Sequence, residues 1–546
     1  MHDQRPPWQR DEERYMGLDA SQFNAVVLLI LCGVAAAAAA WLFAFGGLDT
    51  ISGGSGPPER GTIVDVGQGQ VPPFEWGSCK FDIPVEASVD CGYLTVPEDR
   101  SNPNSPIVRL HVGVFRTDNP QKAPDPILYL GGGPGENSTE ASSYFYDDLF
   151  KPFLKNRDFI VLDQRGAGFS EPDLDCPELD KAYRDTLDED LSLEDERARG
   201  AEAVTKCHDR LVGEGVNLAA YRSAESAADV NDLRLALGYE QWNLYGVSYG
   251  TRLALTVMRD FPQGVRSVIL DSSYPLQANL YTGIQPDAQR AFDTFFNGCA
   301  ADPGCNANYP ALRSVFFRTV DQLNASPVTE NIVNPLFSLE YKSVVVDGDA
   351  LLSFLFSALY STDYIPILPA VIYEVANGDT QLMGQIMGGF FAQFEELFTP
   401  GMHISVQCSD EAVFSSADEV AATIASYPEL RGLTEGDPTT GTGLFATCAI
   451  WGAAPADPKE NAPVTSDIPT LILSGEYDPI TPPEWGQAVA DTLNNDRFYI
   501  FPGTGHGVAT SGDCPLNITL AFMDNPAAEL DASCIGGMGG PAWLVQ

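Results

Sequence analysis

The sequence predicts an α/β fold in which a mostly parallel, doubly wound sheet is interrupted by a helical insertion. Three observations point to this class. Short apolar runs end in glycine-rich loops, strand and helix patterns alternate along residues 76–275, and the alternation lapses over residues 276–465 before it resumes at 466–546. Because a strand–helix–strand unit closes a parallel sheet with a right-handed crossover, residues 76–275 and 466–546 are expected to form one catalytic domain with residues 276–465 as its cap.

Each predicted element follows from local periodicity. Apolar or alternating runs predict strands at residues 107–115, 126–130, 158–163, 242–245, 265–271, 469–475 and 497–501. Apolar residues at helical spacing predict helices at residues 224–237, 251–261, 288–300, 350–360 and 365–376. The last three of these helices fall in the predicted cap.

The N-terminal region predicts a membrane anchor followed by a tether. Residues 25–47 carry no charge and are long enough to cross a bilayer, while the tail at residues 1–24 holds three arginines and no Lys or Arg follows the span until Arg60. This asymmetry predicts a cytosolic N-terminus and an extracytoplasmic enzyme, joined by a Gly- and Pro-rich linker at residues 48–75. The alternative is a cleaved signal peptide and a secreted product.

The net charge limits the classes of partner, and the cysteines indicate the compartment. The net charge of −44, from 75 acids against 31 bases, argues against nucleic acid as a partner. One of the 11 cysteines, Cys32, lies in the predicted span, and the remaining even number suits disulfides outside the cytosol. Sequence neighbours suggest the pairs Cys79/Cys91, Cys176/Cys207, Cys299/Cys305, Cys408/Cys448 and Cys514/Cys534, although sequence alone does not choose among connectivities. With no CxxC pair and no histidines at ligand spacing, neither a metal nor a cofactor is expected.

A nucleophile motif lies between a predicted strand and a predicted helix. Residues 246–250 read Gly-Val-Ser-Tyr-Gly and match G-x-S-x-G. The glycines permit a sharp turn, and the start of the helix favours negative charge near the serine. Ser248 is therefore the predicted nucleophile of a serine hydrolase.

The base and the acid are expected in later loops. Of the five histidines, His506 lies in a glycine-rich loop directly after a strand, whereas His403 falls in the cap and is interpreted as a packed side chain. Because the order in this architecture is nucleophile, acid, histidine, Asp478 is the predicted acid, with Glu476 as its nearest rival.

A glycine-rich loop after another strand predicts the oxyanion hole. Residues 131–135 read Gly-Gly-Gly-Pro-Gly, so backbone N–H groups could approach a developing negative charge. We expect the N–H of Gly132 or Gly133 to act together with the N–H of Tyr249.

The chain resembles the α/β-hydrolase family of proline iminopeptidase and the secreted tripeptidyl aminopeptidases. The resemblance covers roughly residues 76–546 and rests on the motifs at residues 132–135, 163–170, 246–251, 475–479 and 503–507. It implies an α/β-hydrolase fold and a peptidase that removes residues from a free amino terminus. Family glutamates that hold the substrate amine have no evident match, so Asp410, Glu411 and Glu136 are the candidates for that role.

The function expected from these observations is a serine aminopeptidase that acts on short peptides. The alternative is a carboxylesterase or lipase that uses the same triad on acyl esters. In both cases Ser248, His506 and Asp478 carry the chemistry.

Overall fold

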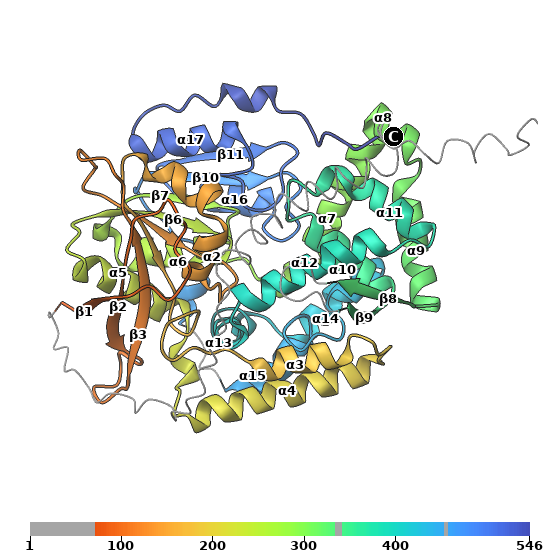
Figure 1. Ribbon diagram of the computed structural model, residues 1–546, viewed down its shortest axis with the longest axis horizontal. Coiled ribbons are helices and arrows are strands. Elements are labelled where there is room, and N and C mark those ends of the chain that lie inside the picture. Colours follow the sequence, from red (N-terminus) through yellow and green to blue (C-terminus); the bar gives the residue numbers. More distant parts are fainter. Residues whose placement is uncertain (1–70, 334–340, 453–456, 546) are drawn as a thin grey trace, which may run out of the picture.

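The main sheet carries the site and is mostly parallel. The computed structural model describes residues 71–333, 341–452 and 457–545, and within them this sheet has nine strands in the order β1-β2-β3-β5-β4-β6-β7-β10-β11 (Figure 1). The strands are β1 (Phe74–Gly77), β2 (Val89–Pro97), β3 (Ile107–Phe115), β4 (Ile127–Leu130), β5 (Phe159–Leu162), β6 (Trp242–Val247), β7 (Val265–Asp271), β10 (Thr470–Gly475) and β11 (Asp496–Phe501). Pairings from β1 through β3 to β5 are antiparallel, and all pairings from β5 through β4 to β11 are parallel.

All seven predicted strands are present within two residues of their expected ends. The prediction missed β1 and β2, which form the antiparallel edge. In β2, Cys91 and Gly92 interrupt the apolar pattern, so local periodicity does not reveal the strand.

The helices fall into two groups. Those between or beside sheet strands are α2 (Ser138–Tyr144), α3 (Pro177–Thr186), α4 (Leu193–Gly213), α5 (Ser223–Ala236), α6 (Tyr249–Asp260), α16 (Pro483–Ala490) and α17 (Asp513–Asp524). Those between β7 and β10 are α7 (Leu280–Ala301), α8 (Pro303–Asn308), α9 (Leu312–Ala325), α10 (Gly348–Ala358), α11 (Leu368–Ala376), α12 (Gln381–Leu397), α13 (Pro400–Asp410), α14 (Ala417–Ser426) and α15 (Gly443–Trp451). The second group also contains an antiparallel hairpin of β8 (Val328–Val333) and β9 (Tyr341–Val346), which was not predicted.

Helices cover both faces of the parallel strands. Leu128 and Leu244 pack in the same core as the helices α5, α6 and α16 on one face. Their chain neighbours Tyr129 and Tyr245 point into a separate core that includes Phe522 of α17. A parallel strand buried on both faces reads as a continuous apolar run, which is why these strands were predictable.

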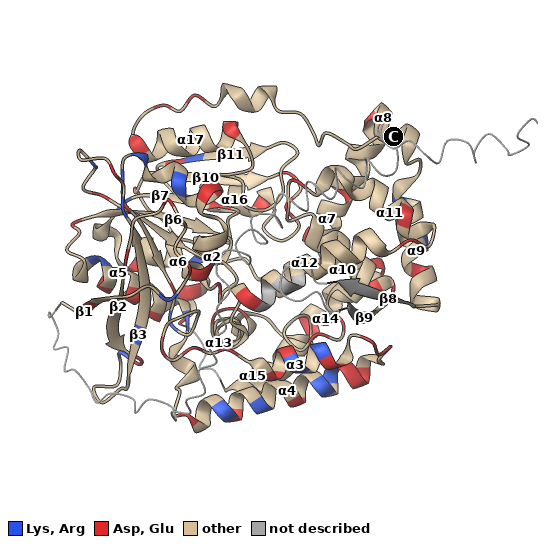
Figure 2. Cartoon of the chain, in the orientation of Figure 1, with Lys and Arg blue, Asp and Glu red and all other residues tan. Residues whose placement is uncertain are grey.

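The insertion between β7 and β10 has a hydrophobic core of its own. Phe292 and Phe316, from α7 and α9, pack with Leu355 of α10 and Ile372 of α11. The helix α4 lies before this insertion in the chain, yet it packs against α15 of the insertion (Figure 1). A segment of the chain outside the insertion therefore also packs on the cap. Lys and Arg alternate with Asp and Glu along α4, as expected for a helix with a solvated face (Figure 2).

Within the described residues there are five disulfides, and they join the five pairs of sequence neighbours that the sequence suggested without choosing among connectivities. They join Cys79 to Cys91, Cys176 to Cys207, Cys299 to Cys305, Cys408 to Cys448 and Cys514 to Cys534. Each bridge closes a loop of 40 residues or fewer in sequence separation.

The predicted membrane span at residues 25–47 lies outside the described residues, as do the tail and most of the linker. In the part of the chain that the structure describes, no helix combines the length and apolar character needed to cross a bilayer.

Candidate active site

Ser248 occupies the turn between β6 and α6. Its backbone has φ 57° and ψ −126°, a conformation that L-residues seldom adopt outside such elbows. A Cβ at Gly250 would stand 1.9 Å from the carbonyl oxygen of Leu130, and a Cβ at Gly246 would stand 2.5 Å from the carbonyl oxygen of Gly250. Both glycines of the motif are therefore required for the tight approach of α6 to the sheet.

His506 and Asp478 form a buried pair. His506 Nδ1 lies 2.8 Å from Asp478 Oδ2, and the backbone N–H groups of Ile480 and Thr481 donate to Asp478 Oδ1 at 3.0 and 2.9 Å. Because the Asp478 carboxylate only accepts, the proton of a neutral His506 resides on Nδ1 and leaves Nε2 as the base.

The pair shifts the pKa of both members. Burial by itself raises the pKa of Asp478, but the charge and hydrogen bond of His506 outweigh it, so this pKa lies below its usual range. Burial lowers the pKa of His506, yet the charge of Asp478 and the hydrogen bond between them more than compensate and raise it. The imidazolium that forms during proton transfer is thus stabilised.

Thr481 is a member of this cluster that the sequence did not reveal. Its hydroxyl donates to Asp478 Oδ2 at 2.7 Å and lies 3.1 Å from His506 Nδ1. It follows Asp478 by three residues, so its place in the turn after the acid is the only local signal.

The rival acid Glu476 has a structural contact instead. Its Oε2 accepts the N–H of Gly503 at 2.9 Å, which ties the loop after β10 to the loop after β11. Among the described residues, the side-chain hydrogen bonds of His506 go to Asp478 and Thr481. Of the two carboxylates weighed from the sequence, the structure pairs Asp478 with the histidine.

Asp271, at the end of β7, connects the nucleophile to the histidine loop. Its backbone carbonyl accepts the N–H of Ser248 at 3.0 Å, and its carboxylate accepts the N–H groups of Val508 and Ala509 at 2.7 and 2.9 Å. Its negative charge also helps to raise the pKa of His506. No motif in the sequence marks Asp271, although it ends a strand at the same edge as Ser248.

The glycine loop after β4 lies beside the nucleophile. A Cβ on Gly132 would stand 3.2 Å from Ser248 Cβ, so the loop passes close to the reacting oxygen. The N–H of Gly132 donates to Glu136 Oε2 at 2.8 Å. Gly133 has φ 100° and lines the cavity at Ser248. Of the two predicted oxyanion donors in this loop, Gly132 thus has a partner within the protein, and the role of Gly133 with the N–H of Tyr249 stays a prediction.

The three carboxylates proposed for substrate binding have internal partners. Besides the N–H of Gly132, Glu136 accepts the hydroxyl of Ser138 at 3.1 Å, and burial raises its pKa. Glu136 thus holds the glycine loop and does not line the pocket.

Asp410 and Glu411 lie behind the pocket wall. Asp410 accepts the N–H of Ser223 at 2.9 Å, and Glu411 pairs with the buried Arg252 at 2.8 Å. Burial raises the pKa of Glu411, and the charge of Arg252 counteracts part of that rise. Neither carboxylate is among the residues that line the cavity at Ser248.

A cavity of about 300 Å³ opens on Ser248 between the sheet domain and the cap. The sheet domain contributes Gly133, Tyr274, Ile480 and Thr481, and the cap contributes Leu280, Tyr281, Ile284, Ser353, Phe356, Ser357, Tyr360, His403, Leu433, Thr434 and Thr440. No Asp or Glu occurs among these lining residues. The wall is thus aromatic, aliphatic and hydroxylic, with the imidazole of His403 among its polar groups.

The cap also holds the histidine loop. The backbone carbonyl of Tyr360 accepts the N–H of His506 at 2.8 Å, and the two rings lie 4.9 Å apart. Thr362 Oγ1 accepts the N–H of Gly505 at 3.0 Å. The position of the base therefore depends on packing against the cap.

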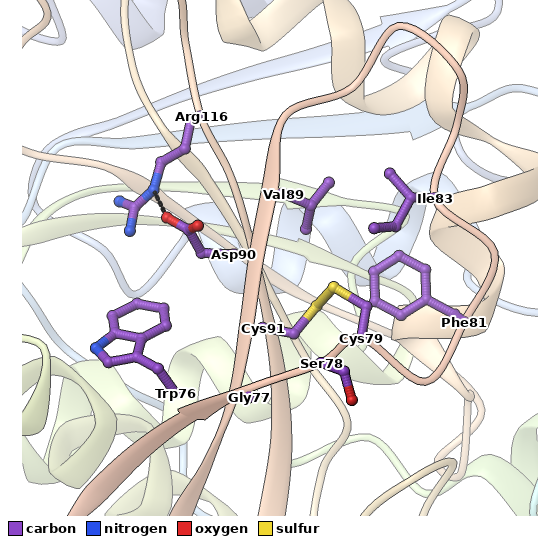
Figure 3. A pocket seen from close by; sticks show the side chains of 10 residues that line it. All are labelled: Trp76, Gly77, Ser78, Cys79, Phe81, Ile83, Val89, Asp90, Cys91 and Arg116. Carbon is purple, nitrogen blue, oxygen red and sulfur yellow. Dashed lines mark hydrogen bonds and ion pairs between the residues drawn. A yellow bond between two sulfur atoms is a disulfide. The ribbon is translucent and has the colours of Figure 1, made fainter.

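A larger hollow of about 680 Å³ lies elsewhere, beside β1 and β2 (Figure 3). It is open and contains the Cys79–Cys91 disulfide and an ion pair of Asp90 with Arg116 at 2.8 Å. It brings together no nucleophile and base, so the smaller cavity at Ser248 is the candidate active site.

Two family models match the chain. Residues 125–337 match a model described as alpha/beta hydrolase fold, and residues 437–534 match one described as TAP-like protein. The first match contains β4 to β7 of the main sheet, and the second contains β10 and β11.

Curated relatives with peptidase names match the chain. The chain is 26% identical to the Serine protease Hip1 of Mycobacterium tuberculosis over 542 residues, which is 95% of this chain and 100% of that protein. It is 28% identical to the Tripeptidyl aminopeptidase of Streptomyces lividans over 221 residues, 39% of this chain and 40% of that protein. It is 24% identical to the Proline iminopeptidase of Xylella fastidiosa over 153 residues, 28% of this chain and 33% of that protein.

Proposed function

We propose that this serine hydrolase of the α/β-hydrolase family is an aminopeptidase that releases residues or short peptides from free amino termini. The observation that carries this proposal is the hydrogen-bonded pair of His506 and Asp478 together with a serine elbow that lines a cavity between the sheet domain and the cap. A cavity of about 300 Å³ admits the end of a peptide but excludes a folded protein.

The reaction follows from the roles of the site residues. Ser248 Oγ attacks the scissile carbonyl carbon while its proton passes to His506 Nε2, and the N–H groups of Gly133 and Tyr249 bind the oxyanion. His506 then gives the proton to the leaving nitrogen as the C–N bond breaks, which leaves an acyl group on Ser248. A water molecule repeats the sequence with His506 as base and releases the acyl product.

The side-chain hydrogen bonds of His506 in the described residues leave Nε2 free for Ser248. Catalytic hydrogen bonds of this kind are often formed only with substrate bound. We expect the bond between Ser248 Oγ and His506 Nε2 to form when substrate fills the cavity.

A panel of peptide amides with free and acetylated amino termini tests the proposal. An aminopeptidase cleaves the free peptides and loses activity on the acetylated ones. Ser248→Ala is the control, and its turnover should fall about 10⁴-fold or more. Equal cleavage of free and acetylated peptides would refute aminopeptidase activity, and retained turnover in Ser248→Ala would refute the nucleophile.

A carboxylesterase is the second candidate, and the chemistry of the cavity wall favours it. No carboxylate lines the cavity to receive a substrate ammonium, whereas its aromatic and aliphatic side chains suit an apolar acyl chain. An esterase would hydrolyse simple acyl esters efficiently and leave peptide amides intact, so the same panel with p-nitrophenyl esters added separates the two activities.

We further propose that the enzyme is held at the outer face of a membrane by residues 25–47, with its N-terminus in the cytosol. The uncharged span, the preceding arginines and the disulfides support this topology. Fractionation of cells expressing the full chain and a chain that begins at residue 48 is the test. The full chain should sediment with membranes and be digested by external protease. If expression of the full chain gave a soluble product of reduced mass, that result would instead indicate a cleaved signal peptide.

A further inference from the structure

The chain segment that enters α13 lies along the glycine loop of the active site. The N–H of Thr399 donates to the carbonyl of Gly135 at 2.8 Å, and the N–H of Asn137 donates to the carbonyl of Leu397 at 2.9 Å. A Cβ on Gly135, which has φ 109°, would stand 2.7 Å from the carbonyl oxygen of Thr399. The cap and the glycine loop are thus joined by backbone hydrogen bonds at this point.

This contact brings His403, in the first turn of α13, to the same loop. His403 Nδ1 lies 3.3 Å from the carbonyl oxygen of Pro134, and the ring lies 5.2 Å from the ring of Phe398. A carbonyl oxygen can only accept, so Nδ1 carries the proton of this hydrogen bond. In the neutral imidazole the second nitrogen, Nε2, is then an acceptor.

The imidazole remains neutral over the working range of a hydrolase. Burial lowers the pKa of His403 to about 4, and the bond to Pro134 opposes only part of that effect. No side chain of the described residues hydrogen-bonds the ring, so its tautomer is set by the glycine loop alone.

His403 lines the cavity together with Ser248 and Gly133. Because no carboxylate lines that cavity, the N–H groups of a bound peptide must find neutral acceptors there. An N–H group that loses water on binding and finds no acceptor weakens binding, so an acceptor at this place discriminates between substrates.

We propose that His403 determines specificity by accepting, through Nε2, a hydrogen bond from the amino-terminal N–H of a short peptide whose carbonyl is held at Ser248. The inference rests on the proposed aminopeptidase function and adds the group that recognises the amine. Recognition by a neutral nitrogen replaces the cap carboxylates that were expected from the sequence.

Two variants separate the two nitrogens of the ring. In His403→Asn the side-chain amide takes the place of Nδ1 and can still donate to Pro134, but nothing replaces Nε2. In His403→Gln the amide oxygen reaches toward the position of Nε2 and can accept, while the bond to Pro134 is lost. The full chain of each variant is assayed with a tripeptide anilide and with its des-amino analogue, in which hydrogen replaces the amine.

The measured quantity is the ratio of kcat/KM for the tripeptide anilide to that for the des-amino analogue. We expect wild type to prefer the free amine, His403→Asn to lose about tenfold of that preference, and His403→Gln to retain most of it. An unchanged ratio in His403→Asn, or an equal loss in both variants, overturns the role of Nε2. If wild type itself shows no preference, the proposed aminopeptidase function fails and the inference fails with it.

Discussion

Replacing Asp478 with Asn removes the charge that faces His506 while keeping the shape of the side chain. The backbone N–H groups of Ile480 and Thr481 both donate to Asp478 Oδ1, so the single oxygen of Asn occupies that position. The amide NH₂ then faces His506 Nδ1, where Oδ2 stood. This arrangement forces Nδ1 to accept and moves the imidazole proton to Nε2, the nitrogen that must take the proton of Ser248.

The expected loss is large because the wrong tautomer cannot act as the base. An Asn in the acid position of a serine triad lowers kcat about 10⁴-fold, and that corresponds to about 5.5 kcal/mol of transition-state stabilisation. The pH profile should move as well. The base is active when neutral, so activity is lost as pH falls through the pKa of His506, which Asp478 raises above its usual value. Without that charge the acid limb of the residual activity should shift to lower pH.

The assay is steady-state hydrolysis of a tripeptide anilide and a p-nitrophenyl ester between pH 5 and about 9, spanning the histidine range. Glu476→Gln is the matched control, because its carboxylate accepts the N–H of Gly503, whereas the side-chain hydrogen bonds of His506 within the described residues go to Asp478 and Thr481. We expect it to lose less than about tenfold, as for a positioning contact. The triad assignment would be refuted if Asp478→Asn kept activity within tenfold of wild type, or if Glu476→Gln fell as far.

Three further changes test the packing around the site. Gly250→Ala places a Cβ 1.9 Å from the last carbonyl oxygen of β4. The free energy of unfolding should therefore fall by about 1–3 kcal/mol or more, and ester turnover should be abolished. A variant with wild-type Tm and activity would contradict this geometry. Removing the disulfide by Cys408→Ala with Cys448→Ala, at a sequence separation of 40, should lower the free energy of unfolding by about 4 kcal/mol in urea titrations, and an unchanged midpoint would argue that the bridge constrains little. Arg252→Met leaves Glu411 buried without its partner and should destabilise the protein by about 3–5 kcal/mol, a loss that adding Glu411→Gln should partly reverse if the unpaired charge is its cause.

Local sequence patterns were sufficient for the parallel sheet and its nucleophile. The strands β4, β5, β6, β7 and β10 are buried on both faces, and that environment selects the continuous apolar runs from which they were predicted. Ser248 was found because a sharp strand-to-helix turn demands glycines at fixed offsets, and those offsets are visible in the sequence.

The residues around the triad were less accessible to such reasoning. His403 was interpreted as a packing residue and contacts the glycine loop, while Glu136, Asp410 and Glu411 were expected to bind substrate and have partners within the protein. Their local sequence is compatible with either role. What distinguishes the roles is the partner, and the partner of Asp410 is 187 residues away in the chain.

The sequence by itself determined the α/β sheet and the motifs that contain Ser248, Asp478 and His506, because each depends on residue types at short spacing. Only the tertiary structure decided which acid faces the histidine, which glycine N–H is bound by Glu136, how the cysteines pair and which side chains form the cavity wall. Asp271, for example, holds the loop of His506 through hydrogen bonds that span 237 and 238 residues. Contacts of that range arise when the two segments of the catalytic domain pack together with the cap, and no local pattern encodes them.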